Sequence, residues 1–101
     1  MNEVEFRNWL ASKGMKKKVQ SDTVSRLKRV EKEINRCDID EHYRNDRCEY
    51  LLSLFTNMGK NEEMERFPDA NLPIGKYYMS TFRHALKKYV EFCDETILES
   101  L

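Results

Sequence analysis

The sequence predicts an all-α protein: one domain, residues 1 to 101, built as a compact bundle of four to five helices. The main observation is the stretch from Lys76 to Leu98, where apolar residues recur every three or four positions, as they do on one face of an α-helix. No segment shows the strict apolar and polar alternation of a strand. Charged residues make up 36% of the chain against 40% hydrophobic, which is typical of a folded helical domain rather than a disordered one.

This C-terminal stretch has two unlike faces. The residues expected to point inward are Tyr78, Phe82, Ala85, Leu86, Tyr89, Cys93 and Ile97. The opposite arc carries Arg83, His84, Lys87, Lys88 and Glu91, so the same helix offers a largely basic surface to solvent or to a partner. The rest of the chain is expected to form the helices that cover the inward face.

Two helices are predicted in the first third of the chain. The first spans about residues 3 to 13 and ends at Gly14, because glycine accepts the left-handed conformation that closes many helices. The second starts near Lys18 or Ser21 and runs to Arg36, with Ser21 as an alternative N-cap. Its inward residues are expected to be Thr23, Val24, Leu27, Val30 and Ile34.

A third helix is predicted from about residue 41 to 58, capped by Asp38 or Asp40, with Leu51, Leu54 and Phe55 as its core. The connection 59 to 75 holds both prolines and two of the three glycines. Since a structureless connection of that length is unusual, we expect a helical turn over 61 to 66, with Phe67, Leu72 and Ile74 packed on the core. The last helix leads into an acidic tail, about 94 to 101, that either frays or packs on a partner.

Charge is distributed unevenly, although the net charge is zero. Residues 13 to 29 carry seven Lys or Arg residues and one acid, and residues 76 to 88 carry four Lys or Arg residues and no acid. Two basic segments on a neutral chain predict a patch that contacts a polyanion. The side chains that could neutralise phosphates are Lys16, Lys17, Lys18, Arg26, Lys28, Arg29, Arg83, Lys87 and Lys88, and His84 could add a pH-dependent contact. The alternative is that these side chains form solvated helix faces.

The order FRNWLASKGM, then a charged helix, then FRHALKKYVEF resembles the N-terminal core-binding (SAM-like) domain of tyrosine recombinases and phage integrases. The positions that carry the resemblance are Phe6, Leu10, Gly14, Met15, Leu27, Ala85, Leu86, Tyr89 and Phe92. The resemblance implies a SAM-like bundle in which the second and fourth helices face double-stranded DNA. Those two helices coincide with the two basic segments of this chain.

The same resemblance argues against an enzyme. Strand cleavage in that family needs an arginine and histidine constellation and a nucleophilic tyrosine on a separate catalytic domain, for which 101 residues leave no room. We therefore expect a non-catalytic, cofactor-free DNA-binding domain, a standalone relative of domains used in DNA recombination by mobile elements. The alternative is a protein-interaction, inhibitor or regulatory module that docks through the acidic tail or the 59 to 75 connection.

Other chemistry has weaker support in the sequence. Cys37, His42 and Cys48 are irregularly spaced, and a structural zinc site usually takes four ligands. A Cys93 and His84 pair would straddle opposite sides of one helix. Three cysteines without CxxC spacing fit reduced thiols, and there is no long apolar run or signal peptide, so we expect no membrane contact and a cytoplasmic protein.

Overall fold

The computed structural model describes the backbone of residues 1 to 100 and the side chains of residues 1 to 97. Within that part, the chain has five α-helices, three short 3-10 helices and no strand, which confirms the all-α prediction. The α-helices are α1 (Glu3–Ser12), α2 (Lys17–Glu33), α3 (Ile39–Asp46), α4 (Glu49–Leu54) and α5 (Ser80–Ser100). The 3-10 helices are η1 (Thr56–Gly59), η2 (Met64–Arg66) and η3 (Tyr77–Met79).

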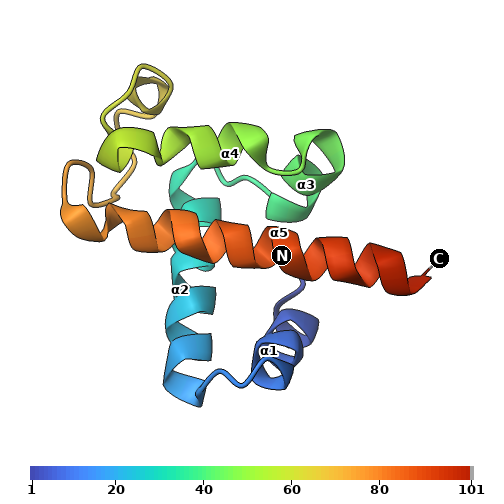
Figure 1. The fold of residues 1–101 in the computed structure, drawn as a ribbon. Coiled ribbons are helices and arrows are strands. Elements are labelled where there is room, and N and C mark those ends of the chain that lie inside the picture. The colour runs from blue at the N-terminus through green and yellow to red at the C-terminus, as the bar shows by residue number, and fades with distance from the viewer. Residues whose placement is uncertain (101) are drawn as a thin grey trace.

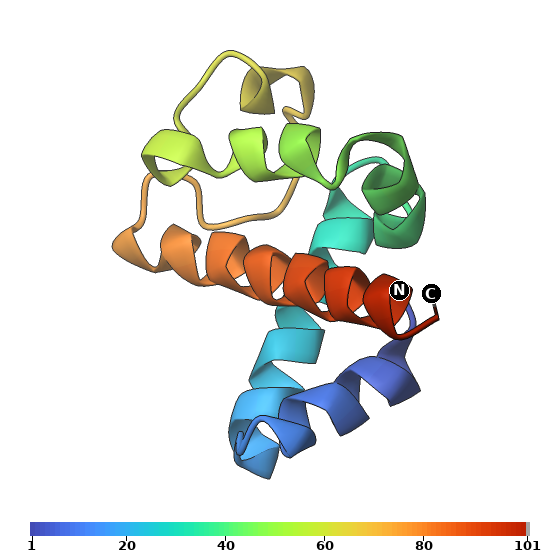
Figure 2. The same cartoon turned by 45° about the vertical axis from the view of Figure 1, so that its right-hand side comes forward.

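Helix α5 is the axis on which the other helices are arranged. It runs across α2 at a steep angle, with α4 beside it on one side and α1 on the other (Figure 1). The turned view keeps α1 and α4 on opposite sides of α5 (Figure 2). Helix α2 makes its most extensive contacts with α5 and α1, so these three helices enclose most of the core.

The turn from α1 to α2 is closed by Gly14, as the sequence predicts. Gly14 has φ +84°, a conformation that side chains with a Cβ rarely adopt. The Met15 N–H donates to the Leu10 carbonyl at 3.1 Å, and the Gly14 N–H donates to the Ala11 carbonyl at 3.0 Å. This pair of bonds is the Schellman arrangement, which satisfies carbonyl groups that the helix end leaves unpaired.

Helix α2 buries the five residues that the sequence assigns to its inner face, Thr23, Val24, Leu27, Val30 and Ile34. It begins at Lys17, so the alternative N-cap at Ser21 is wrong. The predicted end at Arg36 is also wrong: the helix ends at Glu33, because Asn35 and Arg36 both adopt positive φ, 54° and 50°, and turn the chain.

The single helix predicted over 41 to 58 is wrong, because Arg47 and Cys48 interrupt it with φ of 56° and 64°. Asp38 caps α3 as expected, accepting the Asp40 N–H at 3.0 Å. Asp46 then starts α4 by accepting the Tyr50 N–H at 3.0 Å. The core residues predicted for this region, Leu51, Leu54 and Phe55, are all buried.

The connection after α4 contains the short helical turn that the sequence predicts, at Met64–Arg66. Asn61 organises it, because its amide nitrogen donates to the Leu54 carbonyl at 3.0 Å and its oxygen accepts the Met64 N–H at 2.9 Å. Leu72 is buried and Phe67 is half-buried, as expected. The expectation for Ile74 is wrong, because its side chain is 39% exposed, whereas Met64 in the same connection is buried.

Helix α5 buries Phe82, Ala85, Leu86 and Tyr89 and leaves Cys93 half-buried, in line with the predicted face. The prediction is wrong for the two residues at the ends of that face, since Tyr78 is 45% exposed and Ile97 is 48% exposed. Residues 77 to 79 form a 3-10 turn with fewer residues per turn than an α-helix, so Met79 rather than Tyr78 meets the core. The helix continues through Ser100, while Leu101 lies outside the described residues.

Tyr89 joins three parts of the core. Its ring is fully buried, 4.9 Å from the ring centre of Phe6 in an edge-to-face contact and 5.5 Å from that of Phe92. Its hydroxyl accepts the Asn2 N–H at 2.7 Å and donates to the Asp40 carboxylate, and burial raises the pKa of this phenol. The start of α1 and the first turn of α3 are therefore both bonded to α5 through one side chain.

A second polar contact fixes the break between α3 and α4 to α5. Asp94 accepts the Tyr43 hydroxyl at 2.6 Å and the Arg47 Nε–H at 3.1 Å. Hydrogen bonding from Arg47 lowers the pKa of Asp94, against an opposing effect of burial, and Tyr43 lowers it further. Arg47 is thus held by tertiary structure in its positive-φ conformation, at a position with no glycine.

We predict that Tyr89→Phe lowers the free energy of unfolding by about 1 to 3 kcal/mol, because the Asn2 N–H and the Asp40 carboxylate both lose a partner. Urea unfolding followed by circular dichroism measures this change. The control is Tyr77→Phe, which removes a hydroxyl from a residue that is 84% exposed and should change stability by less than about 0.5 kcal/mol. Equal stability of Tyr89→Phe and the parent protein would contradict the role of the hydroxyl.

We predict that Asp94→Asn is destabilising at neutral pH and that its effect disappears in acid. A carboxyl whose folded pKa is depressed below 3.8 stabilises the fold above that value, and the contribution is lost as pH falls through the folded pKa. Thermal unfolding of both proteins from pH 7 to pH values below about 3 measures the difference. A difference in melting temperature that is the same at every pH would contradict this assignment.

Candidate nucleic-acid interface

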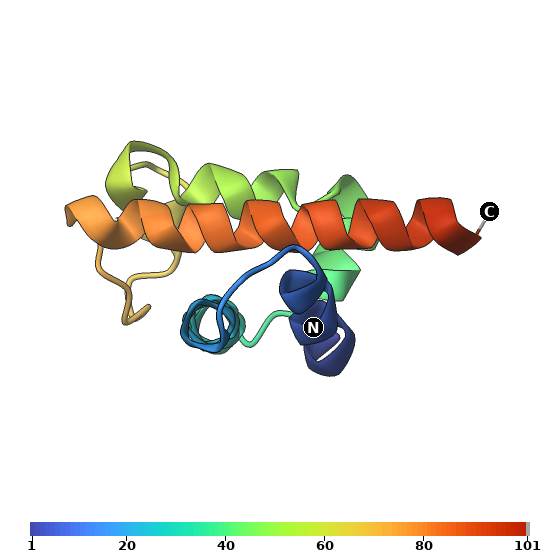
Figure 3. The ribbon, with the colours of Figure 1, turned by 60° about the horizontal axis from the view of Figure 1, so that its bottom comes forward.

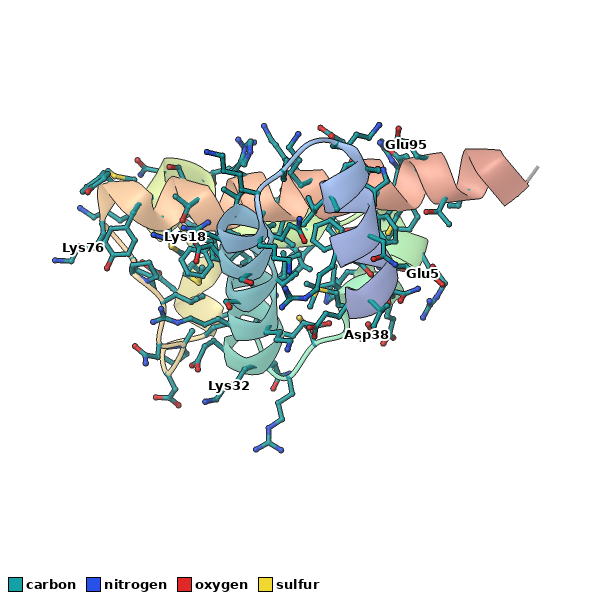
Figure 4. The ribbon with its side chains drawn as sticks, turned by 90° about the horizontal axis from the view of Figure 1, so that it is seen from below. Glu5, Lys18, Lys32, Asp38, Lys76 and Glu95 are labelled. Carbon is teal, nitrogen blue, oxygen red and sulfur yellow. The ribbon has the colours of Figure 1, made fainter. Side chains whose placement is uncertain are left out.

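The ten basic side chains proposed from the sequence lie on α2, on the connection before it and on the first half of α5. Because α2 and α5 cross in extensive contact, the two basic segments are neighbours in the fold. Figure 4 places Lys18 on α2 beneath the first half of α5, and Lys32 at the opposite end of α2. Lys18 and Lys76 lie on one side of this view, whereas Glu5 and Asp38 lie on the other, next to α1 (Figure 4).

Two of the ten side chains form ion pairs within the chain. Lys28 Nζ lies 2.7 Å from the Glu3 carboxylate, and hydrogen bonding from Lys28 is the main cause of the lowered pKa of Glu3. Lys88 Nζ lies 3.5 Å from the Glu91 carboxylate on the next turn of α5. These two cations are partly neutralised before any ligand arrives.

Arg29 is also engaged by the fold, whereas Arg83 is enclosed without a bonded partner. The Arg29 Nε–H donates to the Asn71 carbonyl at 2.8 Å, and its guanidinium carbon lies 5.8 Å from the ring centre of Phe82. Glu33 accepts the Asn71 N–H at 2.8 Å, so this pair on α2 fastens the connection that precedes α5. Arg83 is half-buried, and its Nε is enclosed without a hydrogen-bond partner.

Seven of the ten proposed side chains make no hydrogen bond or ion pair with another described residue. They are the half-buried Arg83 and six others: Lys16, Lys17, Lys18, Arg26, His84 and Lys87. Among the six besides Arg83, Arg26 is half-buried and the other five are exposed. We call these six residues the open basic set. They lie at the start and middle of α2 and on the outer face of α5.

The connection between α1 and α2 starts at a contact with α5. Lys13, at the end of α1, reaches the Glu95 carboxylate at 2.9 Å and so fixes the start of the connection against α5. From there the chain passes to α2, which Figure 3 shows nearly end-on beneath α5. Lys16, Lys17 and Lys18 therefore follow directly after a residue that is bonded to α5.

The start of α2 differs from the starts of α1, α3 and α4, while α5 resembles α2 in having no acidic residue in its first turn. Helix α1 has Glu3 and Glu5 in its first turn, and α3 and α4 begin with backbone N–H groups bonded by Asp38 and Asp46. Helix α2 has no acidic residue in its first turn, no side-chain cap, and begins with three consecutive lysines, Lys16, Lys17 and Lys18. The sequence analysis missed this feature because it placed the start of the helix at Lys18 or Ser21.

The cysteines and histidines form no recognisable catalytic arrangement in the described residues. Cys37, Cys48 and Cys93 are free thiols, and burial is the main cause that raises their pKa values, to about 11 for Cys37 and about 12 for the other two. His84 is exposed on the outer side of α5. Between residues 1 and 97, no three His, Cys, Asp or Glu side chains are grouped to hold a metal ion.

No family model, curated protein or solved structure matches this chain. The resemblance to recombinase core-binding domains therefore stays a prediction that depends on the few positions quoted above. In the described part of the chain, no helix has the length and apolar character needed to cross a bilayer. The proposal of DNA binding therefore depends on the geometry of α2 and α5 and on the charges that they carry.

We predict that Arg29→Ala destabilises the fold by about 1 to 2 kcal/mol, since it removes hydrogen bonds to Asn71 and the contact with Phe82. The matched control is Lys32→Ala, an exposed lysine on the same helix, which should change stability by less than about 0.5 kcal/mol. Thermal unfolding of both variants measures the difference. If Arg29→Ala behaves like Lys32→Ala, then Arg29 is not fastened by the fold.

Proposed function

We propose that this chain is a non-catalytic DNA-binding domain that contacts the duplex backbone through the start of α2 and the first half of α5. The cations that would neutralise phosphates are the open basic set. Lysines bind phosphate as point charges, and they carry little sequence information on the backbone. The proposed binding is therefore tolerant of DNA sequence and steeply dependent on salt.

The start of α2 is the observation that carries this proposal. Cations near a helix N-terminus oppose the helix dipole, each at a cost of about 0.3 to 1 kcal/mol, and the first backbone N–H groups of α2 have no side-chain cap. Stability alone favours a carboxylate there, as at the starts of α1, α3 and α4. A phosphate would satisfy both the lysines and the unpaired N–H groups.

The crossing of α2 and α5 supports a two-helix contact. His84 and Lys87 lie on adjacent turns of the outer face of α5 and both are exposed. Two separated groups of cations on crossing helices can contact phosphates on different parts of a duplex, which fixes orientation better than one group does. Arg26, half-buried between them, is the member of the set best suited to a bidentate phosphate contact.

The second candidate is a protein-interaction module, favoured by an apolar groove in the connection before α5. The groove has a volume of about 600 Å³ and includes Met64, Phe67, Pro68 and Ile74 in its lining. Met58, just before it, is 39% exposed. This function would use the opposite chemistry, burial of apolar side chains, and would leave the open basic set unused.

We predict that the double variant Lys17→Glu, Lys18→Glu binds an arbitrary-sequence duplex at least about tenfold more weakly than the parent chain at low salt, because phosphate contacts are lost and repulsion is added. Fluorescence anisotropy of a labelled duplex measures the affinity. The same variant should unfold at a higher temperature, because carboxylates favour the N-terminus of α2. Weaker binding together with greater stability separates a binding role from a structural one.

The matched control for this experiment is Lys32→Glu, at the far end of the same helix (Figure 4). It changes the net charge in the same direction and should lower affinity by much less than the double variant. Because Lys32→Glu makes half the charge change of the double variant, a loss of half the size on a logarithmic scale would show that net charge alone governs binding. Absence of duplex binding by the parent chain at low salt would reject the proposal and favour the protein-interaction module.

A further inference from the structure

A groove between α2 and the start of α5 combines aromatic and cationic side chains. It has a volume of about 350 Å³ and is lined by Asp22, Ser25, Arg26, Arg29, Tyr78, Thr81 and Phe82. Lys18 lies one turn before Asp22 on α2, so the groove continues the surface occupied by the open basic set. The start of α5 and Lys76 lie on the same side of the molecule as Lys18 (Figure 4).

The aromatic side of this groove presents tyrosine rings that are exposed and do not fill the core. Tyr78 is 45% exposed and Tyr77 is 84% exposed, with their ring centres 5.7 Å apart at 84°. Met79 fills the core position that the helical period assigns to this turn, so neither tyrosine is needed there. A ring left partly open beside a positive charge is suited to stacking a flat, anionic ligand.

One of the two arginines on the cationic side of the groove has no partner within the fold. Arg29 is occupied by the Asn71 carbonyl and by Phe82. Arg26 is half-buried and has no hydrogen-bond or ion-pair partner among the described residues, although Asp22 lies one turn away on the same helix. A half-buried guanidinium without a partner favours an anion such as phosphate.

We propose that this groove holds one unpaired nucleotide of a DNA strand that extends beyond the duplex bound by α2 and α5. The base stacks on Tyr78, the phosphate pairs with Arg26, and the Asp22 carboxylate is placed to accept an N–H from the base edge. The groove is open along α2 toward Lys18, the direction from which the strand arrives. This inference rests on the proposed function, and it adds a preference for duplexes with single-stranded ends.

The test compares a blunt duplex with the same duplex carrying a short single-stranded overhang, by fluorescence anisotropy at one salt concentration. Stacking of one base predicts an affinity gain of about fivefold or more for the overhang. Tyr78→Ala should remove this gain and leave the affinity for the blunt duplex unchanged. Tyr78→Phe keeps the ring and should keep the gain.

Circular dichroism checks that Tyr78→Ala is folded, and Ser25→Gln is the second variant if it is not. Ser25 is exposed on α2, and a longer neutral side chain there fills the groove without changing charge. Its ratio of overhang to blunt affinity should fall toward one. A ratio that stays at the parent value in a folded variant overturns the proposed site.

The outcomes distinguish this inference from the function on which it rests. Binding of the blunt duplex with no gain from the overhang overturns the groove and leaves duplex binding intact. If no duplex binds, the overhang strand alone is titrated. Binding of that strand that is lost in Tyr78→Ala supports the groove, and absence of binding overturns it together with the proposed function.

Discussion

The buried side chain of Tyr89 is the constraint on which the arrangement of the helices depends. Its ring occupies the centre of an aromatic cluster with Phe6 and Phe92, and its hydroxyl is bonded to the backbone of Asn2 and to Asp40. A buried hydroxyl without partners would cost stability, so α1 and α3 must approach α5 where they do. The position of α1, together with the Lys13 contact to Glu95, in turn directs the connection that leads to the start of α2.

The same arrangement determines which charged side chains are paired within the fold and which remain unpaired. Carboxylates stand at the starts of α1, α3 and α4. Other ion pairs with carboxylates neutralise Lys13, Lys28 and Arg47. The start of α2 receives none of them, although a helix N-terminus attracts negative charge. The three lysines at this helix start therefore oppose the helix dipole, and the proposed contact with DNA phosphates would account for their position.

Much of the fold could be predicted from the sequence because helical periodicity reports burial directly. Leu27, Leu86 and Leu51 are buried as the spacing of apolar residues predicts. The break at Arg47 and Cys48 could not be predicted, because no glycine or proline marks it and a contact with Asp94 holds it. At the candidate site, the basic segments could be located from the sequence. Which of their cations are bonded within the fold could not, because Lys28 and Arg29 are bonded to Glu3 and Asn71, which are distant in sequence.

The central claim is that the start of α2 and the first half of α5 form one surface for duplex DNA. The most direct test is the change in backbone amide NMR signals of the labelled protein when an arbitrary-sequence duplex is added at low salt. The account predicts changes concentrated in residues 16 to 26 and 80 to 88, which reverse when salt is raised. Changes confined to residues 59 to 75, or no changes, would contradict it.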